Sequence, residues 1–200
     1  SKDEKFSLQT SILKSSQRNN LMAVDFTGNV FQAPNAPALY DGNGNLNWEE
    51  NTFENPLANL NNRYNARTED LTARVQVNMK ISSELNFGTS AGITTNRSEE
   101  KNVLPSTIYN PAYGLTSEFS SVSTSSFTRD SWIVEPQLSW NRNTDMGIWS
   151  ALAGATFEER KQEGINILAD NFTSNAFIDN TANALNHRVT RDTESRYRYM

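Results

Sequence analysis

The segment from Leu71 to Thr95 alternates apolar and polar residues over two successive runs. The apolar positions of the first run are Leu71, Ala73, Val75, Val77, Met79 and Ile81. After a polar break at residues 82–84, the second run places Leu85, Phe87, Thr89, Ala91 and Ile93 at every second position. A period of two is typical of extended strands with one apolar and one polar face. The pattern predicts a hairpin whose apolar face meets either another protein layer or lipid.

The composition is polar and acidic. Hydrophobic residues make up 36% of the 200 residues, the mean hydropathy is −0.66 and the net charge is −5. Asn, Ser and Thr together supply about a third of the chain, which suits long wet loops and a polar lumen. Lys and Arg are scattered without a basic stripe, so no nucleic-acid partner is predicted. The absence of Cys excludes disulfides and thiolate metal sites.

The apolar segments are too short for a transmembrane helix, which needs about 18 consecutive apolar residues. Strands of a membrane barrel do not show such runs, so this observation does not exclude a membrane barrel. The chain begins at Ser1 without a signal peptide and stops at Met200 within a strand pattern. We therefore expect a piece of a longer protein.

Alternation predicts further strands along the chain. They cover residues 4–15, 68–81, 85–97, 132–140 and 148–162, and a last one begins near Thr190. Pro136 within a strand predicts a bulge or a local kink. Short turns are expected at 82–84 and 141–147, and long loops at 18–65, 98–130 and 163–188. Within these loops we expect a helical turn after Pro56 and a short helix capped by Ser174 or Asp179.

Strand length and loop asymmetry decide the predicted fold class. Strands of roughly ten to fourteen residues exceed the five or six typical of soluble sheets, and short turns opposite long loops are typical of outer-membrane barrels. We predict an all-β antiparallel transmembrane β-barrel segment of about six long strands, an open curved sheet as a fragment, with short periplasmic turns and long extracellular loops. The residues predicted to face lipid are Leu71, Ala73, Val75, Val77, Met79, Ile81, Leu85, Phe87, Trp132, Val134, Leu138 and Trp140.

The second face of the predicted strands is polar, and a soluble fold remains an alternative to the barrel. The polar face is predicted to line an aqueous interior or to be simply solvated, and it carries Arg74, Gln76, Asn78, Lys80, Glu135 and Gln137. A soluble β-sandwich also contains alternating strands. The alternative function is therefore a soluble, surface-attached carbohydrate-binding β-module.

Several motifs in one order carry a family resemblance. They are "ENPLANLNNRY", the hairpin from Leu71, "LPSTIYNPAYG", "SWIVEPQLSW" and "ALAGATFEE", preceded by "APALYDGNGNLNWEE". In this order they resemble the barrel region of SusC/RagA-type TonB-linked outer-membrane transporters of Gram-negative bacteria. The resemblance covers nearly the whole chain. It implies that residues 1–200 form one partial barrel domain.

The resemblance implies a function for the whole protein rather than for this piece. It implies a barrel of twenty-two strands with a plug domain, importing oligosaccharides or peptides with energy from the TonB complex. It also implies a SusD-like lipoprotein lid and a location in the cell outer membrane. The plug, the TonB-contacting segment and most strands are absent from these 200 residues.

The sequence shows little enzymatic machinery, and no enzyme activity and no cofactor are predicted. His187 is the one histidine and sits in a polar segment, so it is expected to face solvent. Glu158 and Glu159 are adjacent, so on a strand they point to opposite faces and cannot form a catalytic carboxylate pair. A secreted glycan-active enzyme is the least favoured alternative.

The long loops hold the candidate binding residues. Tyr40, Trp48, Tyr109 and Tyr113 could stack on sugar rings or contact peptides, although packing between the loops or against a lipoprotein is the favoured explanation. Asp41, Asn43 and Asn45 alternate as in oxygen-rich calcium loops, but the segment fails the EF-hand template. A Gly-Asn turn is favoured there, and no metal site is predicted.

Overall fold

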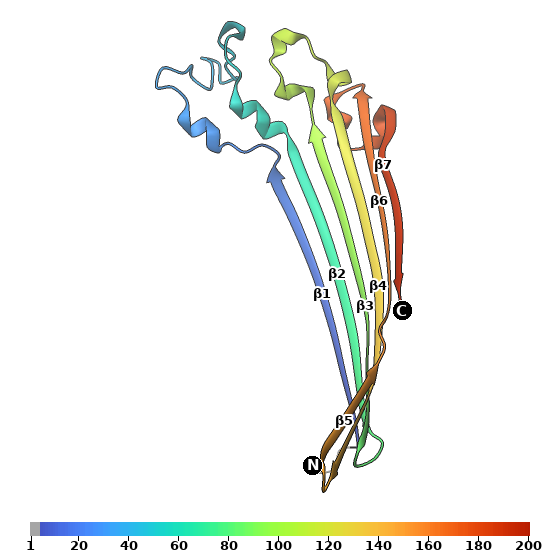
Figure 1. The fold of residues 1–200 in the computed structure, drawn as a ribbon. Coiled ribbons are helices and arrows are strands. Elements are labelled where there is room, and N and C mark those ends of the chain that lie inside the picture. Colours follow the sequence, from blue (N-terminus) through green and yellow to red (C-terminus); the bar gives the residue numbers. More distant parts are fainter. Residues whose placement is uncertain (1–4) are drawn as a thin grey trace.

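The computed structural model describes residues 5–200 and consists of one antiparallel sheet (Figure 1). Its strands are β1 (Phe6–Met22), β2 (Arg63–Lys80), β3 (Leu85–Leu104), β4 (Ser121–Thr144), β5 (Gly147–Gly154), β6 (Phe157–Phe172) and β7 (Ala184–Tyr199). Consecutive strands pair, except that β5 and β6 both pair with β4, so seven strands share six positions. The predicted all-β antiparallel open sheet is confirmed. Residue 4 of the predicted first strand, Glu4, lies outside the described residues.

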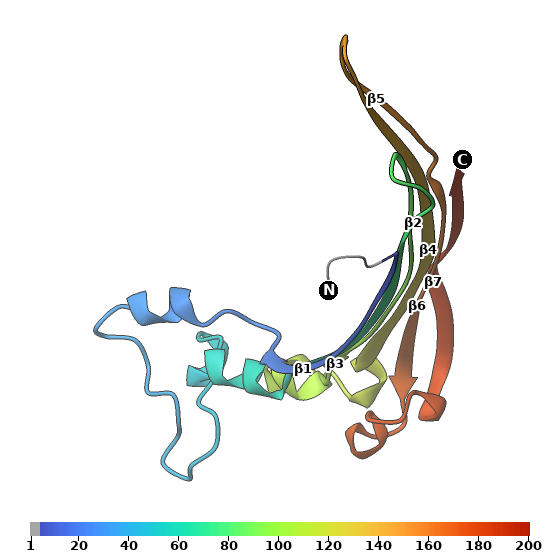
Figure 2. The same ribbon diagram turned by 90° about the horizontal axis from the view of Figure 1, so that it is seen from below.

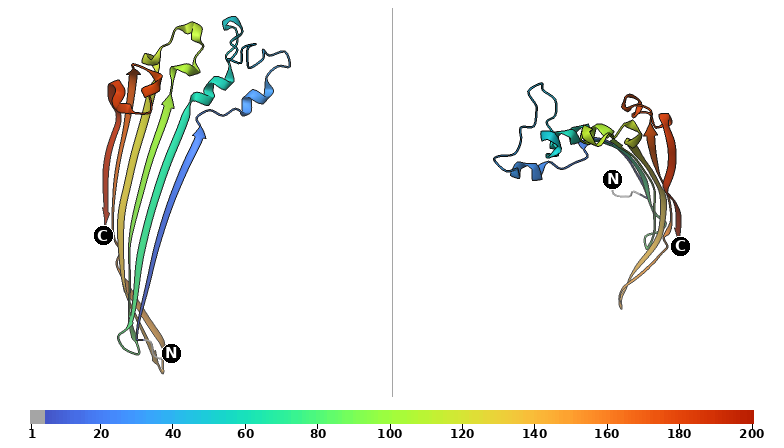
Figure 3. Two further views of the ribbon diagram at one scale, coloured as in Figure 1. Left: turned by 180° about the vertical axis from the view of Figure 1, so that it is seen from behind. Right: turned by 90° about the horizontal axis from the view of Figure 1, so that it is seen from above.

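The sheet has short turns at one end and long connections at the other (Figures 1 and 3). The long connections cover residues 23–62, 105–120 and 173–183. Their helical segments are short 3-10 helices: η1 (Thr27–Phe31), η2 (Glu49–Asn51), η3 (Pro56–Asn61), η4 (Ser106–Ile108), η5 (Pro111–Tyr113), η6 (Ser117–Phe119), η7 (Asn175–Phe177) and η8 (Thr181–Asn183).

The strands reach further toward the long connections than predicted. Residues 98–130 do not form one loop, because β3 continues to Leu104 and β4 starts at Ser121. The predicted loops at 18–65 and 163–188 are shortened in the same way by β1, β2, β6 and β7. On β1, β2 and β3 both faces of these upper parts are mostly polar, so the period-two signal disappears from the sequence while the backbone pairing persists. On β6 the signal persists, because Ile165, Ile167 and Ala169 occupy alternate positions.

The interruption between β5 and β6 lies opposite Pro136. Gln137 pairs with Gly154 and Val134 pairs with Phe157, so the register is the same on both sides of the gap. The amide of Ala155 donates to the Pro136 carbonyl at 3.1 Å. Proline has no N–H to return this bond, and the ladder is interrupted there. The predicted bulge at Pro136 is wrong, since no extra residue is inserted; the one register shift lies between β6 and β7 at Asn166/Ile167.

Among the described residues, side-chain caps mark the starts of four of the eight short helices, η3, η5, η7 and η8. The Oδ1 atom of Asn55 accepts a bond from the Leu57 amide at 3.0 Å, which confirms the helical turn predicted after Pro56. Ser174 caps η7 as predicted. Asp179 is not a cap; Asn180 caps η8 instead.

The sheet is a single curved layer (Figure 2). Its buried apolar cluster is small and lies at the end of the long connections: Val103, Val122, Ala169, Phe172, Ile178 and Ala184. Ile178 comes from the β6–β7 connection, which folds back over the upper ends of the strands. The described residues contain no second layer over the rest of the sheet, so burial is concentrated at one end of the molecule.

Candidate functional site: an apolar belt, a polar face and a loop hollow

The pairing register places the predicted lipid-facing residues on one face of the sheet. Val75 pairs with Ala91, which pairs with Val134, and Phe87 pairs with Leu138. Directly paired residues point to the same side, so the alternating sets of neighbouring strands merge. We call this band the apolar belt; besides the predicted residues, it contains Phe6, Leu8, Ile12, Ile93, Trp149, Ala151, Ala153 and Phe157.

The apolar belt is open to its surroundings. The large side chains Phe6, Ile93 and Trp149 are each more than half exposed, as are Leu8, Ile12 and Ile81 on this face. Soluble monomers rarely expose contiguous apolar patches above a few hundred Å². Lipid contact of the belt remains a prediction, and the belt is the candidate site for it.

From β2 to β6 the upper edge of the apolar belt descends across the sheet; on β1 the last apolar residue of the belt, Ile12, pairs with Ala73, two residues below Leu71. The continuous apolar runs of β2, β3, β4 and β6 end at Leu71, Ile93, Trp132 and Phe157. Leu71 pairs with Thr95, Ile93 pairs with Trp132, and Phe157 pairs with Val134, so the edge drops four residues in three steps between strands. At about 3.3 Å per residue and about 4.8 Å between strands, this slope corresponds to strands inclined at about 40° to the belt.

The height of the belt follows from its length and slope. The apolar run covers nine positions from Trp132 to Trp140 and eleven from Leu71 to Ile81. At the inclination above, these runs rise about 20–25 Å, close to the apolar band of outer-membrane barrels. At the lower edge, the indole N–H of Trp140 donates to Glu84 Oε2 at 3.3 Å, so its polar tip is satisfied where the belt ends.

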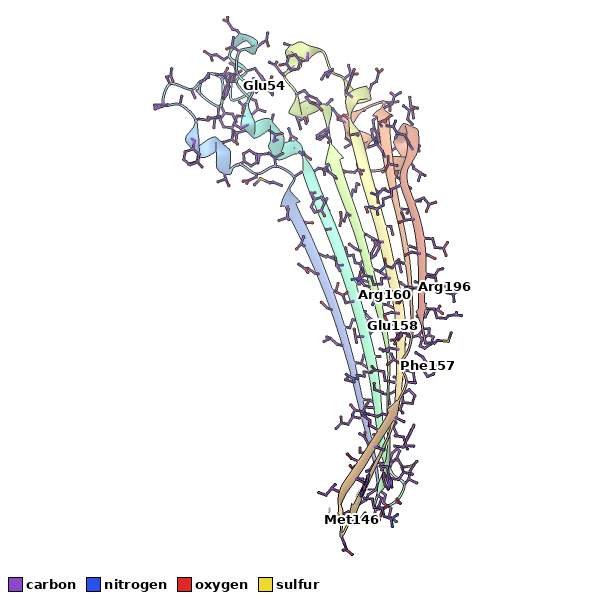
Figure 4. The ribbon with its side chains drawn as sticks, in the orientation of Figure 1. Glu54, Met146, Phe157, Glu158, Arg160 and Arg196 are labelled. Atoms are coloured by element: carbon purple, nitrogen blue, oxygen red, sulfur yellow. The ribbon has the colours of Figure 1, made fainter. Side chains whose placement is uncertain are left out.

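The opposite face is polar and lies on the inside of the curve. Figure 4 shows Glu158 and Arg160 on this side of the sheet, and Phe157 and Arg196 on the outer side. A hollow of about 700 Å³ opens on the polar face, and the predicted Arg74, Gln76, Asn78, Glu135 and Gln137 line it. The predicted Lys80 shares this face, and the Ser90 hydroxyl donates to Glu135 at 3.0 Å.

The connections bring together two of the four predicted aromatic residues. Trp48 and Tyr109 line a hollow of about 810 Å³ formed by all three long connections. Tyr40 does not join them; it is exposed and bridges to Leu46. Tyr113 donates its hydroxyl to Glu54 Oε1 at 2.5 Å, and this carboxylate raises the pKa of Tyr113 (Figure 4 labels Glu54).

Buried polar side chains fix the shape of this hollow, and no pattern in the sequence predicted them. Asn55 is buried and donates to the carbonyls of Leu39 and Asn47 at 2.6 and 2.9 Å. Ser120 accepts from the Ser106 amide at 2.7 Å and donates to Asn175 at 2.5 Å. These bonds tie each connection to a neighbouring segment, which only the folded chain brings close.

The Asp41 segment forms a closed turn. One carboxylate oxygen of Asp41 accepts from the amides of Asn43 and Asn45, both at 2.8 Å, and Gly44 has a φ of +83°. The Asn45 amide bond is the main cause that lowers the pKa of Asp41. The carboxylate is therefore occupied by backbone donors of its own turn, as in the Asx turn that the sequence favours.

The remaining chemical candidates are separated. His187 Nε2 lies 2.7 Å from the Thr181 carbonyl oxygen. Glu158 pairs with Arg160 at 3.0 Å, whereas Glu159 pairs with Arg196 and Arg198, both at 2.6 Å, on the other face. Within residues 5–200, no three His, Asp or Glu side chains gather as a metal site would require.

The structure contains one charged surface that was not predicted, because Lys and Arg are scattered along the sequence. Above the apolar belt, on the same outer face of β1, β2 and β3, the register gathers Lys14, Arg18, Arg63, Arg67, Arg97 and Lys101. Glu69 and Glu99 are the acidic residues of these strands on that face. We call this surface the outer basic patch. Its residues come from three strands, so the statement that no basic stripe exists is true of the sequence and wrong for the sheet.

Comparison of the sequence with models of known protein families found no match, and neither did comparison with curated proteins. Residues 5–200 contain no helix long and apolar enough to cross a membrane.

Proposed function

We propose that this chain is a segment of a membrane-spanning β-barrel in the outer membrane of a Gram-negative bacterium. In this proposal the apolar belt faces the acyl chains, and the polar face looks into an aqueous interior. The ends with short turns lie at the periplasmic side, and the long connections lie outside the cell.

One observation carries the proposal: a continuous, uncovered apolar belt whose edge slopes across the register. A soluble sheet buries its apolar face against a second layer. The described residues provide no such layer over the belt. The slope of about 40° agrees with the strand tilt of barrels, which a flat soluble sheet has no reason to produce.

The two edges of the sheet support the same proposal. Within the described residues, β1 pairs only with β2 and β7 pairs only with β6. Unpaired backbone groups in hydrocarbon cost several kcal/mol each, roughly, so a membrane sheet must close. We therefore propose that β1 and β7 pair with further strands of the same barrel.

The transport role rests on the resemblance to SusC/RagA-type proteins. We propose a part in TonB-dependent import of oligosaccharides or peptides, with a SusD-like lipoprotein as partner and no catalytic step in this segment. The hollow at Trp48 and Tyr109 is the proposed contact for substrate, because aromatic faces beside amides and hydroxyls suit sugars and peptide groups.

Site-directed spin labels test the membrane assignment directly. The chain has no Cys, so single labels can be placed at Val75, Val77 and Phe87 on the belt, with Gln76, Ser90 and Gln137 as matched controls on the polar face. In phospholipid vesicles the belt labels should be relaxed by oxygen and protected from an aqueous nickel quencher, and the controls should show the reverse. Equal protection from both reagents at the belt positions would indicate a protein interior and overturn the proposal.

A further inference from the structure

The outer basic patch is a local excess of positive charge on an acidic chain. On this face, the three strands carry six basic and two acidic residues, whereas the whole chain carries a net charge of −5. Arg63 and Lys101 are partly compensated by Asp179, at 2.8 and 3.9 Å. Among the described residues, Lys14, Arg18 and Arg97 form no ion pair, so the surface retains unneutralised charge.

Two arginines of the patch oppose each other directly. Arg18 on β1 is the register partner of Arg67 on β2. Like charges at such positions destabilise a sheet. Arg67 pairs with Glu69 and has Glu99 as its register partner on β3, so part of its charge is compensated. Arg18 forms no ion pair among the described residues and keeps its full charge. An anion between the two side chains would turn this repulsion into attraction.

A hollow of about 460 Å³ lies at this pair. Arg18, Arg67 and Lys101 line it, and so do the acidic Glu99 and Glu100, so the cations exceed the carboxylates by one. Ile165 and Ile167 of β6 contribute an aliphatic part. Thr124 and Ser126 add hydroxyl donors on β4. Cations, hydroxyls and aliphatic surface together suit an anion that is attached to an apolar body.

The position of the patch relative to the belt identifies the kind of anion. Lys14 lies two residues beyond Ile12, and Arg67 lies four residues beyond Leu71. At the inclination of the strands, these charges stand about 5–10 Å beyond the belt edge. The polar headgroup region of one leaflet is about 5–8 Å deep. A lipid whose chains rest on the belt would therefore present its headgroup to the patch.

We propose that the outer basic patch binds the phosphate groups of an anionic membrane lipid whose acyl chains lie on the apolar belt. This inference rests on the proposed membrane location. The lipid would bridge Arg18 and Arg67 through charge-assisted hydrogen bonds, which guanidinium groups form in pairs with phosphate.

Mixed vesicles test this inference with the whole 200-residue chain. The chain is refolded into phosphatidylethanolamine vesicles that contain a bis-phosphorylated glucosamine lipid or its dephosphorylated form, then extracted in mild detergent. Native mass spectrometry measures the bound lipid. We expect selective retention of the phosphorylated lipid and a loss of about tenfold to thirtyfold in Arg18→Gln/Arg67→Gln, since each basic residue near an anionic surface adds about a fivefold preference.

The matched control is Arg129→Gln/Arg191→Gln, which removes the same charge from the opposite, polar face of the sheet. It should retain the phosphorylated lipid like the unaltered chain. Equal retention of both lipids, an equal loss in the control, or full displacement by 10 mM inorganic phosphate would each overturn the inference. Belt spin labels in the same vesicles separate the two levels: inserted labels without lipid selectivity reject only the lipid site, and labels that stay in water reject the membrane location as well.

Discussion

Asp41 shows how single side chains shape the long connections. Its carboxylate accepts hydrogen bonds from the backbone amides of Asn43 and Asn45. The bond from the Asn45 amide is the largest cause of the lowered pKa of Asp41. The sequence indicated a turn here from the Gly and Asn residues. It could not indicate that Asn55, ten residues after Asn45, is buried and holds this part of the connection through three hydrogen bonds.

The Asp41 turn should depend on pH in one direction. The folded pKa of Asp41 lies below the ordinary value of 3.8. Its stabilising contribution is therefore complete above that value and is lost as the pH falls through the lower, folded pKa. The amide chemical shifts of Asn43 and Asn45 should therefore titrate with a midpoint below the ordinary value. A transition at or above the ordinary value would contradict this, and Asp41→Asn should remove the transition.

Asn55→Ala should loosen the connection that carries Trp48. The substitution leaves the carbonyls of Leu39 and Asn47 without their donor and removes the cap of η3, which we expect to cost about 1–3 kcal/mol. Urea unfolding in detergent, followed by Trp fluorescence, measures this. Asn59→Ala on the same short helix is the control, because no side-chain bond involves it, and its effect should stay within about 0.5 kcal/mol. Equal effects of the two substitutions would reject the role of Asn55.

At the scale of elements, the sequence predicted strands only where one face is apolar. The β3 strand was predicted for residues 85–97 because Leu85, Phe87 and Ile93 alternate with polar residues. In its continuation to Leu104, Glu99 and Glu100 lie on opposite faces, so polar side chains occur on both faces of the strand. This part of β3 is held by its pairing with β2 and β4, and the pattern of a single strand does not specify that pairing.

Pro136 offers a test of the ladder between β4 and β5–β6. Valine at this position would supply the missing N–H opposite Ala155, within the belt, where the proposed acyl chains would offer no water in its place. We expect Pro136→Val to raise the free energy of unfolding by about 1 kcal/mol, after the entropy gained by the unfolded chain is subtracted. Thr89→Val, on the register partner of Pro136, changes the same face without adding a donor. If both variants unfold at the same urea concentration, the missing donor is not the cause of the interruption.

At the scale of the whole molecule, the sequence predicted the faces but not what the register assembles on them. Trp48 and Tyr109 meet in one hollow, whereas Tyr40 and Tyr113 do not line it. Arg18 and Lys101 share a second hollow although 82 residues separate them in the chain. These neighbours depend on pairing between distant strands, which alternation in a single strand does not specify.

The slope of the apolar belt gives the last prediction, because it separates depth in a membrane from position in the register. Leu71, Thr95, Asp130 and Lys161 form one register row. Leu71, Ile93 and Phe157 lie on the sloping belt edge instead. If the belt lies flat in a bilayer, spin labels along the edge should report equal depth. Labels along the register row should then rise steadily, by about 10 Å from Leu71 to Lys161, as strands inclined at about 40° require.

The comparison of oxygen and nickel accessibility at each label measures this depth in vesicles. Both series contain Leu71 and span the same strands, so the register row is the internal control for the belt edge. A bilayer is a flat slab about 30 Å thick, and residues selected to meet its boundary must lie in one plane whatever the pairing between strands. Equal depth along the register row would place the strands upright and leave the slope of the belt without a cause. Equal depth along the edge would tie the slope to a membrane, since a second protein layer follows the register rather than a plane.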